Sequence, residues 1–141
     1  MRPHDEVKAE LVRKWLAKAE QDVAAAEALL GQDPPLLYPS CFHSQQAAEK
    51  YLKAFLTWHQ VEFRKTHDLG ELLDLIGKVD QSLAASLGGV TALNPYGVVV
   101  RYPGDIPEPA RPEAEEALRL ARLVRDAIME ALPPFGKAES S

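Results

Sequence analysis

The spacing of apolar residues in long segments constrains the fold of this chain more than any other feature. From residue 7 to residue 30 an apolar side chain recurs every three or four positions, which is the repeat of an amphipathic helix. These residues are Val7, Leu11, Trp15, Ala19, Val23, Ala26 and Leu30. The pattern predicts one long helix that ends at Gly31, because Pro34 and Pro35 keep the following chain extended.

Two further segments in the first half of the chain show the same repeat. A second helix is expected from about Cys41 to His59, with Ser40 as its N-cap. A third is expected to begin at Asp68, because Glu71 follows three positions later as in a capping box, and to continue to Val79. The two helices are separated by a short connection, so they are expected to be neighbours in space.

The second half of the chain is less regular. A fourth helical stretch, carrying Leu83, Leu87, Val90 and Leu93, is interrupted by Gly88 and Gly89. Residues 98–100 are three valines, and they fit either a short extended segment or the end of that helix. A last helix is expected from Pro112 to the prolines at 133–134, with a buried face of Ala117, Ala121, Val124, Ile128 and Ala131.

These segments predict an all-α fold, an up-and-down bundle of four to five helices. The chain has 141 residues, which suits a single domain, and we assign that domain to residues 1–134. Residues 135–141 are expected to form a disordered tail.

Composition excludes several classes of function. The net charge of −5 argues against a general binder of duplex nucleic acid, although a local basic patch is compatible with it. The single cysteine, Cys41, excludes an internal disulfide and a cysteine-based zinc site, and we expect it to be buried. The sequence shows no apolar run of the ~20 residues that a membrane span needs. The polar N-terminus lacks a secretory signal, so cytoplasmic residence and no membrane contact are expected.

Polar residues on the second predicted helix are the first candidates for a site. His43, Gln46, Lys50 and Lys53 are three or four positions apart and share one face, and Glu49 can pair with Lys53. One interpretation is a solvated helix face with a weak ion pair. The alternative is the wall of a groove, in which the two lysines contact phosphate and the glutamine positions a base.

Two histidines and one arginine–tyrosine pair complete the set of candidates. His43 and His67 titrate near neutrality and could act as ligands or as acid–base groups, although His67 beside Asp68 also fits a helix cap. Two histidines without a well-spaced carboxylate predict no metal site, and nothing predicts a cofactor. Arg101 and Tyr102 precede a proline, where they could bind phosphate or instead cap and fill the bundle.

The segment Gln-Gln-Ala-Ala-Glu-Lys-Tyr-Leu-Lys, then Lys-Thr-His-Asp-Leu and later Arg-Tyr-Pro, resembles the HEPN domain family (higher eukaryotes and prokaryotes nucleotide-binding) over nearly the whole chain. The resemblance implies a helical bundle that forms homodimers. It also implies a nucleotide or RNA ligand, and a minimal nucleotidyltransferase as partner in a toxin–antitoxin pair. The positions that match the family pattern are Gln46, Glu49, Lys50, Lys53, His67, Asp68, Arg101 and Tyr102.

One departure from the family pattern bears on catalysis. Ribonuclease members carry an arginine followed, after four to six intervening residues, by a histidine. No histidine of this chain stands at that distance after an arginine, and none follows Arg101. The pair that would serve as general acid and base is therefore missing, so we assign no catalytic residue.

Three hypotheses remain open from the sequence. The first is a ligand-binding subunit that works with a nucleotidyltransferase. The second is an atypical ribonuclease that uses His43 or His67, and the third is a purely structural interaction module. Dimerisation is also expected, because Trp58, Phe63 and Tyr96 exceed what one small core hides.

Overall fold

The computed structural model describes residues 3–98, 104 and 107–135, and the described residues form helices and connections without any strand. Three helices are long: α1 (Pro3–Leu30), α2 (Leu37–Trp58) and α5 (Arg111–Ala131). Three are short: α3 (Leu69–Gly77), α4 (Gln81–Ser86) and the 3₁₀ helix η1 (Gly88–Gly97). The all-α bundle expected from the sequence is confirmed.

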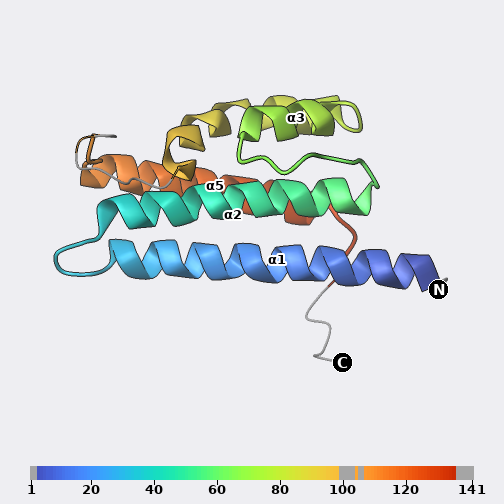
Figure 1. Ribbon diagram of the computed structural model, residues 1–141, viewed down its shortest axis with the longest axis horizontal. Helices are drawn as coiled ribbons and strands as arrows, with labels where there is room; N and C mark the ends of the chain where they lie inside the picture. The colour runs from blue at the N-terminus through green and yellow to red at the C-terminus, as the bar shows by residue number, and fades with distance from the viewer. Residues whose placement is uncertain (1–2, 99–103, 105–106, 136–141) are drawn as a thin grey trace.

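Helix α2 lies at the centre of the molecule. It runs antiparallel to α1, and α3 and η1 cover it on the side away from α1 (Figure 1). It also packs against α5. Its large apolar side chains, among them Tyr51, Leu52 and Phe55, are buried. A helix enclosed on several sides has little solvated face, so its polar residues must find partners inside the protein.

The first helix keeps its predicted face only in its second half. Ala19, Val23 and Ala26 are buried, whereas Val7 is 61% and Leu11 46% exposed. Successive steps of four residues drift around a helix that has 3.6 residues per turn, so Val7 lies about 120° away from Ala19. The start of α1 also extends past the end of α2 (Figure 1), and Ala9 and Val12 form the buried face toward this end instead. The prediction of one continuous buried stripe was therefore wrong at its beginning.

Two helix starts differ in how well the sequence predicted them. Helix α2 begins at Leu37, so Ser40 is not its N-cap; the buried Ser40 hydroxyl donates instead to the carbonyl of Ala26, 2.8 Å away. Pro39 lies in the first turn, where a missing N–H costs little. The cap at Asp68 is confirmed, because its carboxylate accepts from the N–H groups of Gly70 and Glu71.

The carboxylate of Glu71 does not complete a capping box with Asp68. It accepts two hydrogen bonds of 2.7 Å from the Arg64 guanidinium in the preceding connection. Helix α3 then ends at Gly77, two residues before the predicted end at Val79.

The glycine pair at 88–89 divides the fourth stretch as its low helix propensity suggests. Helix α4 ends at Ser86 and η1 follows, with Leu87, Val90 and Leu93 buried. Val98 has extended backbone (φ −104°, ψ 151°), and the other two valines lie outside the described residues.

The last helix begins with Pro112 in its first turn. The Glu113 carboxylate accepts from the backbone N–H of Ala110 at 2.7 Å, which satisfies one of the free donors at this end. The predicted buried face is correct from Ala117 to Ile128, but Ala131, the last residue of the helix, is exposed, and Leu132 after it is buried.

Aromatic residues pack within the monomer more than we expected. Phe63 lies 6.3 Å from Trp15 between ring centroids, and Tyr96 lies 6.1 Å from Tyr38. Trp58 contacts Phe135, at 5.1 Å, although that residue was assigned to the tail. The tail residues 136–141 lie outside the described part. The aromatic argument for a dimer is thus weakened, and dimerisation stays a prediction.

No helix in the described ranges is both long and apolar enough to cross a membrane.

Candidate functional site

A buried carboxylate, Glu49, organises the first part of the site. Glu49 lies on α2, and its side chain is 4% exposed. One oxygen, Oε1, lies 2.7 Å from Nδ1 of His67, and the other, Oε2, accepts from the ammonium of Lys53 at 2.7 Å. Both oxygens therefore have a partner, as a buried carboxylate requires.

Lys53 serves as the internal partner of that carboxylate. Its side chain is also buried, at 6% exposed, and its ammonium lies 5.7 Å from the ring centroids of both Trp15 and Phe63. The aromatic faces and the carboxylate together stabilise a cation away from water. In this position Lys53 supports Glu49 from within the bundle and does not reach the surface.

His67 lies in the connection between α2 and α3, with 67% of its side chain exposed. Three contacts fix it. Its ring is held by Glu49, its carbonyl accepts from Nε2 of Gln45 at 2.9 Å, and the next residue, Asp68, caps α3. Because an ionised carboxylate can only accept, the proton of this hydrogen bond belongs to Nδ1. In the neutral ring Nε2 then carries a lone pair.

A second cluster of a carboxylate, an imidazole and an ammonium lies around Asp22 of α1. This aspartate is 7% exposed, and its Oδ1 lies 2.8 Å from Nδ1 of His43 while its Oδ2 accepts from the ammonium of Lys50. Both partners come from α2 and are only partly covered, with side chains 34% and 22% exposed. We call the two units the Glu49 triad and the Asp22 triad.

The predicted residues fall into two groups. The structure brings six of them together on α2 and the adjoining connection: His43, Gln46, Glu49, Lys50, Lys53 and His67. The other two, Arg101 and Tyr102, lie outside the described residues, so their relation to the site stays a prediction.

Sequence reasoning missed two residues that hold the site together. Gln45 is fully buried; it accepts from Nε2 of Gln46 at 2.7 Å and donates to the carbonyl of His67. Gly97 of η1 lies against its amide, and a Cβ there would come within 3.0 Å of it. Asp22 was missed although a signal existed. It lies three residues after Ala19 and four before Ala26, so it shares their buried face.

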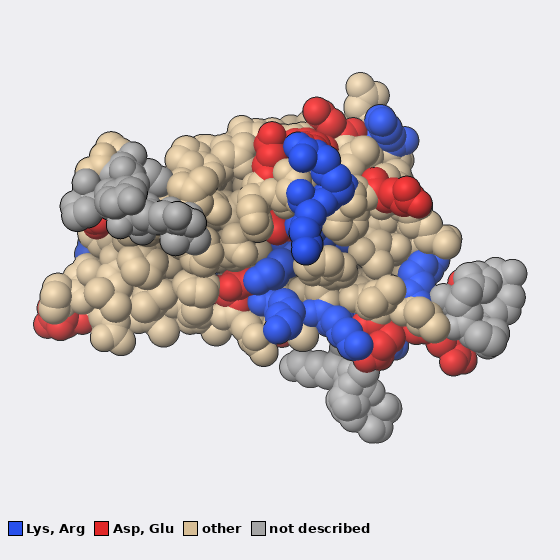
Figure 2. Space-filling model, viewed as in Figure 1, with Lys and Arg blue, Asp and Glu red and all other residues tan. Residues whose placement is uncertain are grey.

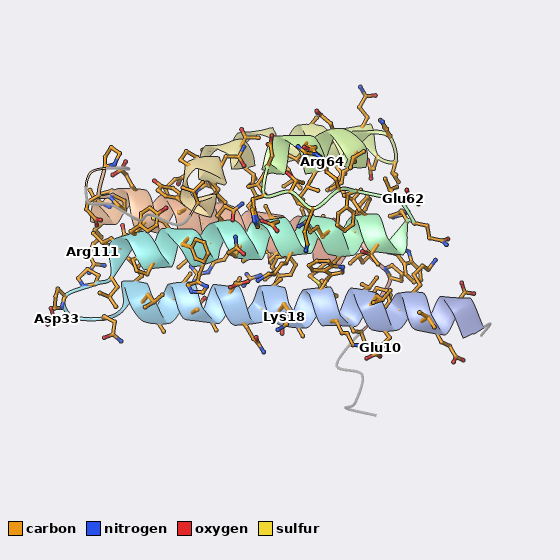
Figure 3. All side chains as sticks on the ribbon, viewed as in Figure 1. Glu10, Lys18, Asp33, Glu62, Arg64 and Arg111 are labelled. Atoms are coloured by element: carbon orange, nitrogen blue, oxygen red, sulfur yellow. The ribbon has the colours of Figure 1, made fainter. Side chains whose placement is uncertain are left out.

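A band of lysine and arginine side chains crosses the face that carries the α2–α3 connection, α2 and α1 (Figure 2). Arg64 in the connection and Lys18 on α1 lie on this face (Figure 3). The band gathers cations on one face although the whole chain carries −5, and carboxylates lie beside it, such as that of Glu71, which accepts from Arg64. Clustered cations of this kind attract anions.

The chemistry available here is that of two oriented imidazoles beside cations. Among the described residues, no three His, Cys, Asp or Glu side chains converge as metal ligands would. Cys41 is buried, as predicted, and its desolvation raises the pKa of the thiol to about 11, so the reactive thiolate is disfavoured.

Comparisons with known proteins give one family model and one curated relative. The model of the HEPN domain matches residues 12–132. The protein named "Putative toxin MJ1304" of Methanocaldococcus jannaschii is 30% identical over 133 residues, which cover 84% of this chain and 86% of that protein.

Two solved structures share the fold. One is TT1696 from Thermus thermophilus, with a TM-score of 0.68 and 29% identity over 86% of this chain and 98% of that one. The other is ST0689, an archaeal HEPN homologue, with a TM-score of 0.64 and 23% identity over 85% of this chain and 96% of that one. The match of the family model across most of the chain shows that this protein belongs to the HEPN domain family.

Proposed function

We propose that this protein is a HEPN-type subunit that binds a phosphate-bearing nucleotide or RNA on the face formed by the two triads. The observation that carries the proposal is the pair of buried carboxylates, Asp22 and Glu49, each of which holds an imidazole by Nδ1. A solvated helix face, the simpler interpretation of the same residues, would not bury the side chains of Glu49 and Lys53 to 6% exposure or less.

The energetics of burial favour a role in binding. Bringing a carboxylate and an ammonium out of water costs several kcal/mol per ion before their attraction offsets it, so apolar residues of the same volume often give equal or greater stability. A bundle that only needed to fold would gain little from Glu49 and Lys53. Their arrangement instead fixes an exposed ring, His67, on the connection that also carries Arg64.

A thermal-shift panel tests the binding proposal. ATP, GTP and a short RNA oligomer are expected to raise the melting temperature by a few degrees through mass action. Lys50→Ala and His67→Ala are expected to reduce the shift, whereas His59→Ala, which replaces an exposed histidine at the end of α2, serves as the control. Absence of any shift with every ligand would contradict the proposal.

We further propose a minimal nucleotidyltransferase as partner in a toxin–antitoxin-like pair, and a homodimer as the working form. The support is the HEPN membership of the chain and the name of the archaeal relative, which calls that protein a putative toxin. Co-expression with a nucleotidyltransferase encoded beside this gene, followed by affinity purification and light scattering, tests both parts. Recovery of this chain alone as a monomer at micromolar concentration would count against them.

A ribonuclease is the second candidate, and one observation favours it. A carboxylate that holds Nδ1–H of a histidine, with Nε2 facing solvent, is the arrangement that orients a general base. Overexpression of the wild type would then arrest growth, and His67→Ala would relieve the arrest. Intact RNA after incubation with purified protein would exclude this candidate.

A further inference from the structure

A cleft of about 230 Å³ lies between α1 and α5, and none of its lining residues belongs to either triad. The lining comes from three helices: Glu20, Val23, Ala24 and Glu27 from α1, Tyr51 from α2 and Arg125 from α5. The four residues of α1 are spaced so that they share one face of that helix. The cleft therefore combines apolar walls with charged groups and a phenol.

The phenol of Tyr51 is the most deeply buried member of this lining. The residue is 1% exposed, yet its hydroxyl has no hydrogen-bond partner among the described residues. Burial raises the pKa of this phenol to about 12, and the carboxylate of Glu20 and the guanidinium of Arg125 also act on it, in opposite directions. Because both of these residues line the cleft, the hydroxyl end of the ring faces it. Buried polar groups in proteins are nearly always hydrogen-bonded, so this hydroxyl points to a partner that enters the cleft.

The carboxylate of Glu20 also lacks a partner. It forms neither a hydrogen bond nor an ion pair with any residue that the structure describes. The other charged groups of the cleft are paired. Glu27 accepts from Arg122 of α5, and the two form an ion pair. Arg125 donates to Asp126 at 2.9 Å. Carboxylates around the cleft thus exceed guanidinium groups by one, and the excess negative charge is that of Glu20.

One chemical group suits both the free hydroxyl and the free carboxylate. An ammonium group has three N–H donors and no acceptor, so it can donate to the phenol oxygen of Tyr51 and to Glu20 while it neutralises the carboxylate. An anion could accept from the hydroxyl, but the unpaired carboxylate would repel it. The apolar side chains of Val23 and Ala24 can contact the methylene groups that follow the nitrogen.

We propose that this cleft binds the primary ammonium group of a small aliphatic amine, with Tyr51 and Glu20 as the hydrogen-bond acceptors. A small molecule is the expected occupant, because about 230 Å³ lies below the roughly 300–1,000 Å³ of pockets that hold drug-sized ligands. The inference goes beyond the proposed function and does not depend on it, since the two use different residues.

An NMR titration with butylammonium chloride tests the proposal. The backbone amide signals of residues 20–27 and of Tyr51 are expected to shift and to reach saturation as the amine is added. Tetramethylammonium chloride is the matched probe, because it carries the same charge but no N–H group. It should bind at least about tenfold more weakly, since losing a hydrogen bond to a charged group costs about that factor or more.

Three variants locate the binding site. Tyr51→Phe removes only the hydroxyl and is expected to weaken butylammonium binding about tenfold. Glu20→Gln removes the charge and should weaken it by at least the same factor. Glu6→Gln is the matched control, because Glu6 is an exposed glutamate about four turns away on the same helix, and it should bind like the wild type. Since Glu20 is exposed, Glu20→Gln keeps the test valid even if Tyr51→Phe disturbs the packing.

Three outcomes would overturn the inference. The first is the absence of saturable shifts in the wild type. The second is equal affinity for the two ions, which would reduce the effect to a general attraction of cations. The third is wild-type affinity in Tyr51→Phe or in Glu20→Gln. None of these outcomes bears on the proposed function, which the ligands of the thermal-shift panel test separately.

Discussion

The Glu49 triad and the Asp22 triad use the same three kinds of group, yet they differ in depth. In the first, the carboxylate and its lysine are both buried and only the imidazole reaches solvent. In the second, the carboxylate is buried but both partners, His43 and Lys50, reach solvent in part. The two lysines lie one helical turn apart on α2, so small differences in rotation around the helix decide which of them is enclosed.

This difference shows that the depth of burial of a side chain, and not its residue type, decides what each lysine can contact. An enclosed ammonium such as that of Lys53 can stabilise only its neighbours, whereas that of Lys50 can be shared between Asp22 and a ligand. The connectivity differs too. The Asp22 triad joins α1 to α2, and the Glu49 triad joins α2 to the connection before α3. One supports the packing of two long helices, and the other positions a loop.

The largest effect should come from substituting the enclosed lysine. Lys53→Met is expected to lower the free energy of unfolding by about 3 kcal/mol, because it leaves a buried carboxylate without its cation. Lys50→Met, the same substitution at the partly exposed position, should cost about 1 kcal/mol. Urea unfolding of both variants measures the difference.

A double variant sharpens this test. Adding Glu49→Gln to Lys53→Met removes the unpaired charge. The double variant should therefore lose less free energy of unfolding than the sum of the losses of the two single variants. Equal losses for Lys53→Met and Lys50→Met would contradict the distinction between the two triads.

Neutralising the other buried carboxylate, that of Asp22, should lower the free energy of unfolding by less. Asp22→Asn keeps the volume of the side chain but removes its charge from His43 and Lys50, both of which can turn toward water. The expected loss of stability is about 1.5 kcal/mol, the low end of the range for hydrogen bonds to charged groups. A loss as large as that of Lys53→Met would show that the Asp22 triad is equally enclosed.

Much of the fold was predictable from the sequence because apolar periodicity and caps are local signals. The cap at Asp68 and the break at Gly88–Gly89 follow from residue chemistry alone. The grouping of the candidate residues on α2 was predictable for a similar reason, since spacing on one helix shows which side chains share a face.

The roles within the site were not predictable. Whether Lys53 faces solvent or the interior depends on Trp15 and Phe63, which come from distant parts of the chain. Asp22 finds His43 across a helix pair, at a separation of 21 residues, and no local rule predicts that contact. Tertiary packing decided these roles.

A modest effect is expected from the cap that follows His67. Asp68→Ala removes the acceptor for two N–H groups at the start of α3 and should cost about 1 kcal/mol. It should also reduce the thermal shift that ATP, GTP or RNA gives, because the connection that carries His67 loosens. Asp80→Ala is the matched control, since Asp80 caps α4 through one bond of 3.0 Å to the N–H of Leu83. It should leave the thermal shift intact. An unchanged thermal shift in Asp68→Ala would show that Glu49 and Gln45 suffice to position the ring.

The smallest effect concerns a histidine that stacks on an aromatic ring. His59 lies 4.3 Å from the ring of Phe55, and desolvation together with nearby Lys8 lowers its pKa. The unfolded chain therefore binds a proton more readily than the folded one near pH 6.5, and this histidine favours the folded state less as the pH falls below that value. His59→Phe should remove that contribution, which we expect to stay below about 0.5 kcal/mol because the side chain is exposed. Urea unfolding at pH 8 and pH 5 measures this contribution. The free energy of unfolding should change less between the two pH values in the variant than in the wild type. Identical differences in the two proteins would mean that this ring is as free to protonate in the folded chain as in the unfolded one.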